Sequence, residues 1–427
     1  MNKIQASNPF FEIYSTPHGT VPFNLIKTEH YAPAIHEGIR RQNGEIDAII
    51  NNPDAPTFEN TIVPYEKSGE LLHRVNTVFG NLLSAETDDE LQELARELMP
   101  LMSEHENNIS LNEKLFARIK TVYELADKAK LTPEQSKLLE DIYTGFVRNG
   151  ANLQGDAKEQ YRNLCKELSL LTLQFSENTL KETNDYRLVL TEKSQLSGLP
   201  ESAIDAAAET AQEKGVEGWV FTLHAPSYSP FMTYADNRDL RRELYMAYNT
   251  KCTHDNACNN LEIVKKIANI HMEIARLLGY DNFAEYNLKE RMAQNSDTVY
   301  KLLNQLLEAY TPTAQKEYDE VQALARSEEG ADFILMPWDW SYYSQKLKDR
   351  KFSINDEMLR PYFELSKVKE GIFGLASKLY GITFKKNADI PVYHKDVPTK
   401  YSTRTAHILP CSIPTSIPEP GNVRGRG

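Results

Sequence analysis

The chain has 427 residues, of which 41% are hydrophobic and 26% are charged, and its formal net charge is −13. This length and composition are typical of a globular protein with a large core, divided into two or three structural units. The acidic balance argues against nucleic acid as a partner, and no apolar run approaches the roughly 18–20 residues of a membrane span.

Four cysteines in so long a chain do not predict a disulfide framework. The first residues lack the apolar segment of a signal peptide. We therefore expect the protein in the cytoplasm, with the alternative that an upstream export signal has been removed.

Helix start signals recur along the chain. Thr132, followed by Pro133 and Gln135, offers an N-cap, a first-turn proline and a capping-box partner. Thr87 with Glu90, and Asp236 with Asp239, predict helix starts in the same way. The sequence RNGANLQGD at residues 148–156 breaks the helical pattern, so we expect a first helical unit to end near residue 150.

Three later stretches carry apolar residues at alternating spacings of three and four, which places them on one helix face. A glycine follows the second and the third stretch, where a helix commonly ends. The three faces are Tyr161, Leu164, Leu168, Leu171 and Phe175; Ile263, Ile267, Ile270, Ile274 and Leu277, before Gly279; and Leu365, Val368, Ile372, Leu375 and Leu379, before Gly381.

Strand signals are few. Residues 186–191 and 219–223 are short and rich in β-forming residues. Residues 224–235, HAPSYSPFMTYA, are rich in proline and serine and are interpreted as a connection. The sequence therefore predicts a mainly α protein with a small β element in the middle.

No complete active site is visible in the sequence. A zinc site of the H-E-x-x-H type needs two histidines one helical turn apart, and the nearest candidate, His105-Glu106, has Ile109 in the second position. We interpret it as a polar patch. Cys252, His254 and Cys258 offer three ligand atoms in seven residues without paired C-x-x-C spacing, so an ordinary loop is favoured over a metal site.

An aromatic segment at residues 335–347, LMPWDWSYYSQKL, is the one candidate for substrate contact. Two interpretations stay open: core packing, which is favoured for such a cluster, and the lining of a peptide channel. The candidate channel residues are Trp338, Asp339, Trp340, Tyr342 and Tyr343.

Several stretches together resemble the M3 family of zinc metallopeptidases, and among its subgroups they are most similar to bacterial peptidyl-dipeptidase Dcp. The resemblance runs from about residue 8 to Val397. Its stretches are Asn8-Pro9-Phe10, IKTEHYAPAI at 26–35, PTFENTI at 56–62, HAPSYSPFMTYA at 224–235, LLGYDNFAEY at 277–286, MPWDWSYY at 336–343 and LRPYFELSKVKEGIFGLASKLYGITF at 359–384.

The resemblance implies a two-lobed helical molecule with a deep channel that admits short unfolded peptides, and catalysis by Zn²⁺ held at an H-E-x-x-H motif. That motif is absent from this chain, so no catalytic residue and no metal ligand is assigned and no zinc is expected to be bound. The implied regions are 1–150, an N-terminal helical region; 151–234, helical with the small β element; and 235–397, the first part of a catalytic lobe that is incomplete here.

Residues 398–427 differ in composition from all that precedes them. They hold five prolines, three glycines and one acidic residue, Glu419. Read from the third base of the codon for Pro410, the codons of the following residues permit V-L-Y-T-D-F-H-P-R-A-G-K-R, which resembles family sequence at this place. We therefore expect a frameshifted, disordered tail that truncates the chain; the alternative is a genuine disordered tail.

Two functions compete. The first is a zinc peptidyl-dipeptidase that releases C-terminal dipeptides from short oligopeptides, of which this chain is a truncated, inactive form. The second is a non-catalytic helical module that binds peptides or another partner. In either case we expect a monomer that contacts unfolded oligopeptides, with neither nucleic acid nor membrane as a partner.

Overall fold

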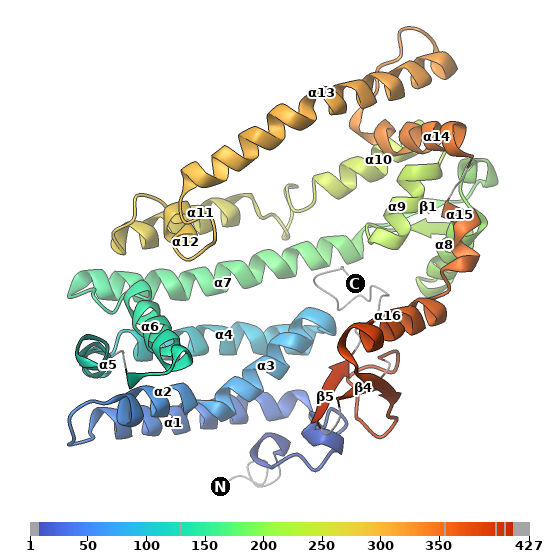
Figure 1. Cartoon of the computed structure of the whole chain (residues 1–427). Coiled ribbons are helices and arrows are strands. Elements are labelled where there is room, and N and C mark those ends of the chain that lie inside the picture. Colours follow the sequence, from blue (N-terminus) through green and yellow to red (C-terminus); the bar gives the residue numbers. More distant parts are fainter. Residues whose placement is uncertain (1–7, 128–129, 354–355, 398, 405–406, 413–427) are drawn as a thin grey trace.

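The computed structural model describes residues 8–127, 130–353, 356–397, 399–404 and 407–412. Figure 1 shows long helices stacked in layers, with α1 to α4 at the bottom, α7 across the middle and α13 at the top. The helices are α1 (Tyr31–Ile50), α2 (Val63–Lys67), α3 (Glu70–Ala85), α4 (Asp89–Ser110), α5 (Glu113–Leu125), α6 (Pro133–Arg148), α7 (Asp156–Asp185), α8 (Glu201–Glu213), α9 (Ala225–Tyr234), α10 (Arg238–Asn249), α11 (Leu261–Leu277), α12 (Phe283–Leu288), α13 (Ser296–Glu329), α14 (Trp340–Phe352), α15 (Asp356–Leu359) and α16 (Leu365–Tyr380). This architecture confirms the mainly α fold. Within the described residues, no helix is long and apolar enough to cross a membrane.

The first core lies between α1, α3 and α4. The ring of Tyr31 packs between Phe10 and Phe79, with ring centroids 5.3 and 5.2 Å away. A side chain at Gly38 of α1 would press against the backbone of Leu72, so this glycine allows α1 and α3 to approach closely. A second core, centred on buried Ile119 and other apolar side chains, joins α5 and α6 to the end of α1.

The two apolar faces predicted for residues 161–175 and 263–277 pack against each other as α7 and α11. Tyr161 and Leu164 of α7 lie in one core cluster with Ile270 and Ile274 of α11. Phe175, predicted on the same face, is 37% exposed. Leu111 at the end of α4 belongs to this cluster too, so a single core joins residues from all three predicted regions of the chain.

The small β element is confirmed as an antiparallel pair of β1 (Leu188–Leu190) and β2 (Trp219–Phe221). The prediction that residues 224–235 form a connection is wrong, because Ala225–Tyr234 form α9. Pro226 occupies the first turn, where no backbone N–H is needed, and Pro230 costs the helix a single interior hydrogen bond. Burial of Phe231 and Met232 in the core around the β element compensates for that loss.

One of the three predicted helix starts matches its sequence signal, and the other two are shifted by one residue. Thr132 caps α6 and forms the predicted capping box with Gln135. Asp88, rather than Thr87, accepts a hydrogen bond at the start of α4, and Asn237, rather than Asp236, does so at the start of α10. Both residues of each neighbouring pair are of a type that is favoured at the N-cap, so a residue type alone does not identify the cap.

The third predicted face forms helix α16, which ends at Gly381 as expected. The face itself stays largely open to solvent: Ile372, Leu375 and Leu379 are 60%, 59% and 64% exposed. Only Phe373 of this helix is buried, against Phe384 of the strand that follows. The loop beyond that strand returns to the start of the chain, where Tyr393 packs edge-on against Phe23.

Part of the tail departs from the expectation of disorder. β3 (Thr383–Lys386), β4 (Thr399–Arg404) and β5 (His407–Ser412) form an antiparallel sheet in that order. The residues of β4 pair along β3, and Pro410 is accommodated because β5 is an edge strand. The expectation of disorder for Pro398, residues 405–406 and residues 413–427 lies outside the described residues.

Candidate functional site

The aromatic segment predicted as a candidate site is anchored by one buried carboxylate. Asp339 ends the short 3₁₀ turn Pro337–Asp339 and precedes α14. Its oxygens accept hydrogen bonds from Arg238, at 2.7 Å from Nη2, and from Arg241, at 3.0 Å from Nη2. The backbone N–H of Met336 donates a further bond at 3.0 Å. A carboxylate with this many donors is held in one position.

The two arginines come from α10, about one hundred positions earlier in the sequence. Arg241 is 1% exposed and also donates to the carbonyl of Ala235 at 2.7 Å. Burial of Asp339 acts to raise the pKa of its carboxyl, but the hydrogen bonds from Arg238, Met336 and Arg241 outweigh burial and lower that pKa. The carboxyl is therefore ionised and ties α10 to the start of α14.

The five candidate residues separate into a buried group and an exposed edge. Asp339, Tyr343 and Tyr342 are 0%, 2% and 7% exposed, so their positions agree with the core-packing interpretation. The Tyr342 hydroxyl donates to Asp236 at 2.8 Å and the Tyr343 hydroxyl donates to Glu329 at 2.8 Å. These three side chains support the segment from inside.

The two tryptophans lie further out. Trp338 is half-buried, with its ring 6.1 Å from that of Tyr245. Trp340 is 40% exposed and stacks on Tyr318 of α13, with ring centroids 6.3 Å apart and an interplanar angle of 7°. Trp340 is therefore the member of the predicted set that reaches the surface most fully.

The Trp340–Tyr318 stack continues into an exposed apolar line along α13 that the sequence analysis missed. Its other members follow the three–four spacing of a helix face, and that spacing is the signal that predicts it. We call this line the α13 stripe; it consists of Tyr300, Leu303, Leu307, Tyr310, Tyr318 and Trp340. An aromatic and aliphatic line of this length is suited to binding apolar peptide side chains.

The described residues do not fit a zinc ion. His105 is buried and its Nε2 lies 2.8 Å from Oε1 of Gln42, so its ring pairs with an amide. Cys252 and Cys258 are buried free thiols, whereas His254 is exposed and its ring nitrogen lies 3.7 Å from Glu182. Within the described part of the chain, no three His, Cys, Asp or Glu side chains are arranged to hold a metal.

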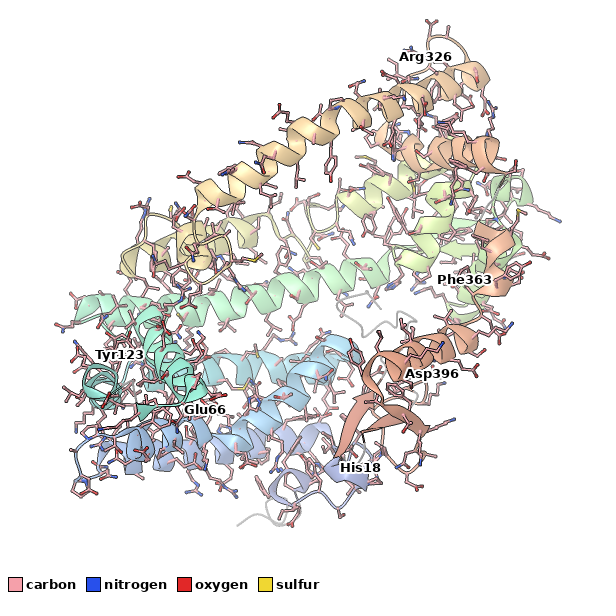
Figure 2. The ribbon with its side chains drawn as sticks, in the orientation of Figure 1. His18, Glu66, Tyr123, Arg326, Phe363 and Asp396 are labelled. Carbon is pink, nitrogen blue, oxygen red and sulfur yellow. The ribbon has the colours of Figure 1, made fainter. Side chains whose placement is uncertain are left out.

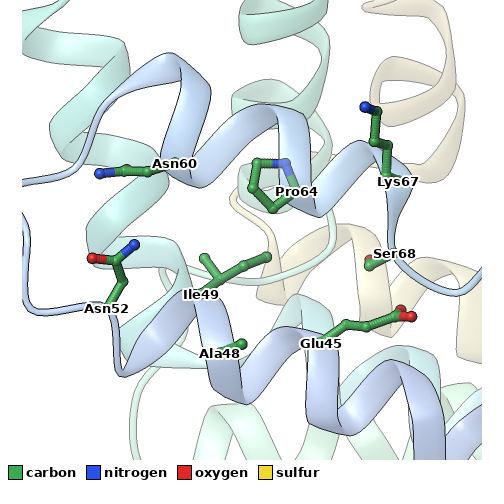
Figure 3. Close-up of a pocket in the computed structure, with 8 residues that line it drawn as sticks. All are labelled: Glu45, Ala48, Ile49, Asn52, Asn60, Pro64, Lys67 and Ser68. Atoms are coloured by element: carbon green, nitrogen blue, oxygen red, sulfur yellow. The ribbon is translucent and has the colours of Figure 1, made fainter.

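Two hollows lie among the N-terminal helices. The smaller, about 410 Å³, lies between α1 and α2 and is shown in Figure 3. There Glu45 accepts a hydrogen bond from the backbone N–H of Gly69 at 2.7 Å, beside Ser68. The larger, about 1070 Å³, lies between the α2–α3 junction, α4 and α6. Lys67 and Ser68 line both hollows, which therefore adjoin across α2.

Residues 231–405, which include the Asp339 anchor and the α13 stripe, match the model of peptidase family M3. The chain is therefore related to the M3 peptidases. It is 35% identical over 392 residues to the dipeptidyl carboxypeptidase of Escherichia coli K12, which covers 91% of this chain and 57% of that protein. It is 34% identical over 386 residues to oligopeptidase A of the same organism, covering 90% of this chain and 57% of that protein.

The similarity extends to a eukaryotic protein. Saccharolysin of Saccharomyces cerevisiae is 25% identical over 377 residues, covering 83% of this chain and 52% of the yeast protein. The chain thus spans a little over half the length of these curated relatives. The resemblance given by the sequence motifs is confirmed over nearly the whole chain, including α1 to α8, which precede the matched region.

Proposed function

We propose that this sequence derives from an oligopeptide-cleaving metallopeptidase of the M3 type that releases C-terminal dipeptides. The observation that carries the proposal is the match of residues 231–405 to the M3 peptidase model, together with 35% identity to a dipeptidyl carboxypeptidase. Short unfolded peptides are the proposed substrates of that enzyme, the cytoplasm is its proposed location and a monomer is its proposed state.

The cofactor in this proposal is Zn²⁺, which would polarise the scissile carbonyl and activate a water molecule. A polypeptide of these 427 residues contains no H-E-x-x-H sequence. We therefore assign it no catalytic or metal-binding residue and propose that it does not hydrolyse peptides. We also retain the proposal that the residues from Pro398 onward are read from another frame.

The described residues can contribute to this function by contacting the peptide. Trp340 and Trp338 are the proposed contact residues of the aromatic segment, and the α13 stripe continues the same surface. Asp339, Tyr342 and Tyr343 position this surface through the hydrogen bonds described above. The three proposed regions, 1–150, 151–234 and 235–397, would then contribute a helical wall, a connecting region and the substrate-facing segment.

The alternative is a non-catalytic helical module that binds peptides. The exposed α13 stripe favours it, since this surface exists without any catalytic group. The experiment is to incubate the purified chain with blocked oligopeptides that have free C-termini and to follow dipeptide release by mass spectrometry. The first proposal expects no release from this chain and chelator-sensitive release from a version that contains the H-E-x-x-H motif.

A binding measurement separates peptide contact from peptide cleavage. Equilibrium binding of the same peptides is measured for the wild-type chain and for W340A, in which the exposed stack with Tyr318 is lost. Weaker binding by W340A without cleavage by either form supports peptide contact at this surface. Dipeptide release by the 427-residue chain, with or without added zinc, would contradict the assignment of no catalytic residue.

A further inference from the structure

The larger hollow lies wholly outside the region that matches the family model. Its lining runs from Gln42 to Asn149, whereas the match begins at residue 231. Its volume of about 1070 Å³ is at the upper end of the range of small-ligand clefts and is sufficient for a few peptide residues. We call it the α2–α6 cleft.

The floor of the α2–α6 cleft is apolar and firmly packed. Phe146 and Ile142 of α6 are 3% and 8% exposed, and Leu138 and Leu72 line the cleft beside them. Phe146 packs on Tyr65 with ring centroids 5.3 Å apart, which fixes Tyr65 at the cleft wall. An apolar floor of this kind accepts the aliphatic part of a side chain.

The helix break between α2 and α3 shapes the polar wall. Ser68 leaves helical geometry, and Gly69 adopts φ +74°, so that α3 starts in a new direction. Ser68 donates to the Tyr65 carbonyl at 2.7 Å and accepts from Gln42 at 3.5 Å. His105 then meets the other end of the same Gln42 amide at 2.8 Å. These hydrogen bonds fix the polar wall, and the acidic side chains at the rim of the cleft take no part in them.

The rim of the cleft is acidic, and three of its four carboxylates form no ion pair within the described residues. Glu66, Glu70, Glu106 and Asp141 line the cleft together with a single lysine, Lys67. Asp141 pairs with Lys137, whereas Glu66, Glu70 and Glu106 form no ion pair within the described part of the chain. Glu66 and Glu106 line the same cleft as Tyr65, and burial, followed by the charges of Glu106 and Glu66, raises the pKa of Tyr65 to about 12.

Figure 2 shows Glu66 at the foot of α6, where the N-terminal helices and α6 cross. The three unpaired carboxylates of Glu66, Glu70 and Glu106 are exposed, whereas Ile142 and Phe146 of the floor are buried. This arrangement suits a long cationic side chain, whose charged end stays at the rim while its methylene groups cover the floor. It disfavours an acidic ligand, because the rim carboxylates would repel it.

We propose that the α2–α6 cleft is a binding site for basic peptide segments, one lysine or arginine side chain of which lies against Tyr65 between Glu66 and Glu106. The occupant follows from charge complementarity and from the amphipathic lining. The site is separate from the surface around Trp340 and does not depend on peptide cleavage by this chain.

The experiment uses the full 427-residue chain and two fluorescein-labelled hexapeptides, one with three lysines and one with three glutamates, in fluorescence anisotropy titrations. We expect the basic peptide to bind and the acidic peptide to bind at least about tenfold more weakly. The variant E66Q/E70Q/E106Q should weaken binding of the basic peptide at least about tenfold and reduce its salt dependence.

The matched control is E93Q/E97Q/E104Q, which removes three exposed carboxylates from α4 outside the cleft and changes the net charge equally. This control should bind the basic peptide like the wild type. Equal loss in both triple variants would show a non-specific charge effect and overturn the proposal, as would equal affinity for the two peptides. Because no cleavage is measured, failure here leaves the proposed peptidase function untouched, and the converse also holds.

Discussion

The Oδ1 atom of Asp339 lies 3.0 Å from Nη2 of Arg241, and the two side chains are 0% and 1% exposed. This pair joins α10 to the start of α14, two elements that are distant in sequence. Arg241 also stacks its guanidinium over the Tyr342 ring at 4.0 Å. Removal of Asp339 would leave the buried charge of Arg241 without a counter-ion, which is far more costly than the loss of a surface pair.

We therefore expect D339N to lower the free energy of unfolding by about 3–5 kcal/mol, because Arg241 would lose its buried carboxylate. Urea unfolding followed by circular dichroism measures the change. E262Q, which removes the exposed Glu262–Lys265 pair, is the control and should leave the urea midpoint unchanged. A D339N midpoint equal to that of wild type would show that the pair is dispensable.

The helices whose apolar residues recur at helical spacing could be predicted from the sequence. The spacing from Tyr161 to Leu171 and from Ile263 to Ile274 correctly indicated two faces, and in the fold they meet each other. Helix α9 was missed because its two prolines resemble a loop, although Phe231 secures it by burial. Periodicity reports local geometry, whereas this burial depends on tertiary partners.

Local sequence patterns predict even less of the candidate site, because its residues depend on tertiary partners. The aromatic segment could be selected from composition, but the role of Asp339 could not, since both arginines that fix it lie about one hundred positions away. The exposure of Trp340 and the burial of Tyr343 likewise depend on where α13 lies. The α13 stripe could have been predicted from the sequence, because Tyr300, Leu303 and Leu307 follow helical spacing.

His105 should make stability depend on pH. Burial lowers the pKa of its ring below the ordinary value of 6.5, so the folded chain binds its proton less readily than the unfolded chain does. The free energy of unfolding should therefore fall as the pH decreases below about 6.5 and level off below the lowered pKa.

Urea midpoints measured for wild type and H105Q at several pH values from 8 to 5 test this prediction. The glutamine variant should show a shallower fall over this range, while His224 and His271, whose pKa values burial also lowers, contribute equally to both proteins. Parallel pH profiles for the two proteins would mean that the ring of His105 is not desolvated in the native state.

Gly218 should be irreplaceable at the start of β2. Its φ is +98°, and a Cβ atom there would meet the carbonyl oxygen of Leu190 in the paired strand. We expect G218A to lower the free energy of unfolding by more than about 2 kcal/mol, since strain and a backbone clash add. Gly279 has φ +84° with open space around it, so G279A should cost about 1 kcal/mol from strain alone. Equal losses in thermal or urea unfolding would show that the Leu190 contact is relieved at little cost.

The purified 427-residue chain should hold no stoichiometric zinc, because its sequence contains no H-E-x-x-H motif. Metal content is measured by plasma mass spectrometry after dialysis, with a C252S/C258S variant as the control for adventitious thiolate binding. One zinc per chain that persists in wild type and disappears in this variant would direct attention to the loop between α10 and α11.

Helices α13 and α16 present apolar faces that should make this polypeptide aggregate. Ile372, Leu375 and Leu379 of α16 are more than half exposed, and the α13 stripe adds aromatic surface of the same kind. Exposed apolar area on this scale promotes association. We expect multiple species in size-exclusion chromatography and strong binding of a hydrophobic dye, both reduced in I372Q/L375Q/L379Q.

A version in which the codons after Val397 are read in the other frame should be monomeric, bind zinc and release C-terminal dipeptides until a chelator is added. A dye-silent, monomeric 427-residue chain would contradict the expected aggregation, and an inactive, zinc-loaded frame-restored chain would contradict the proposed activity.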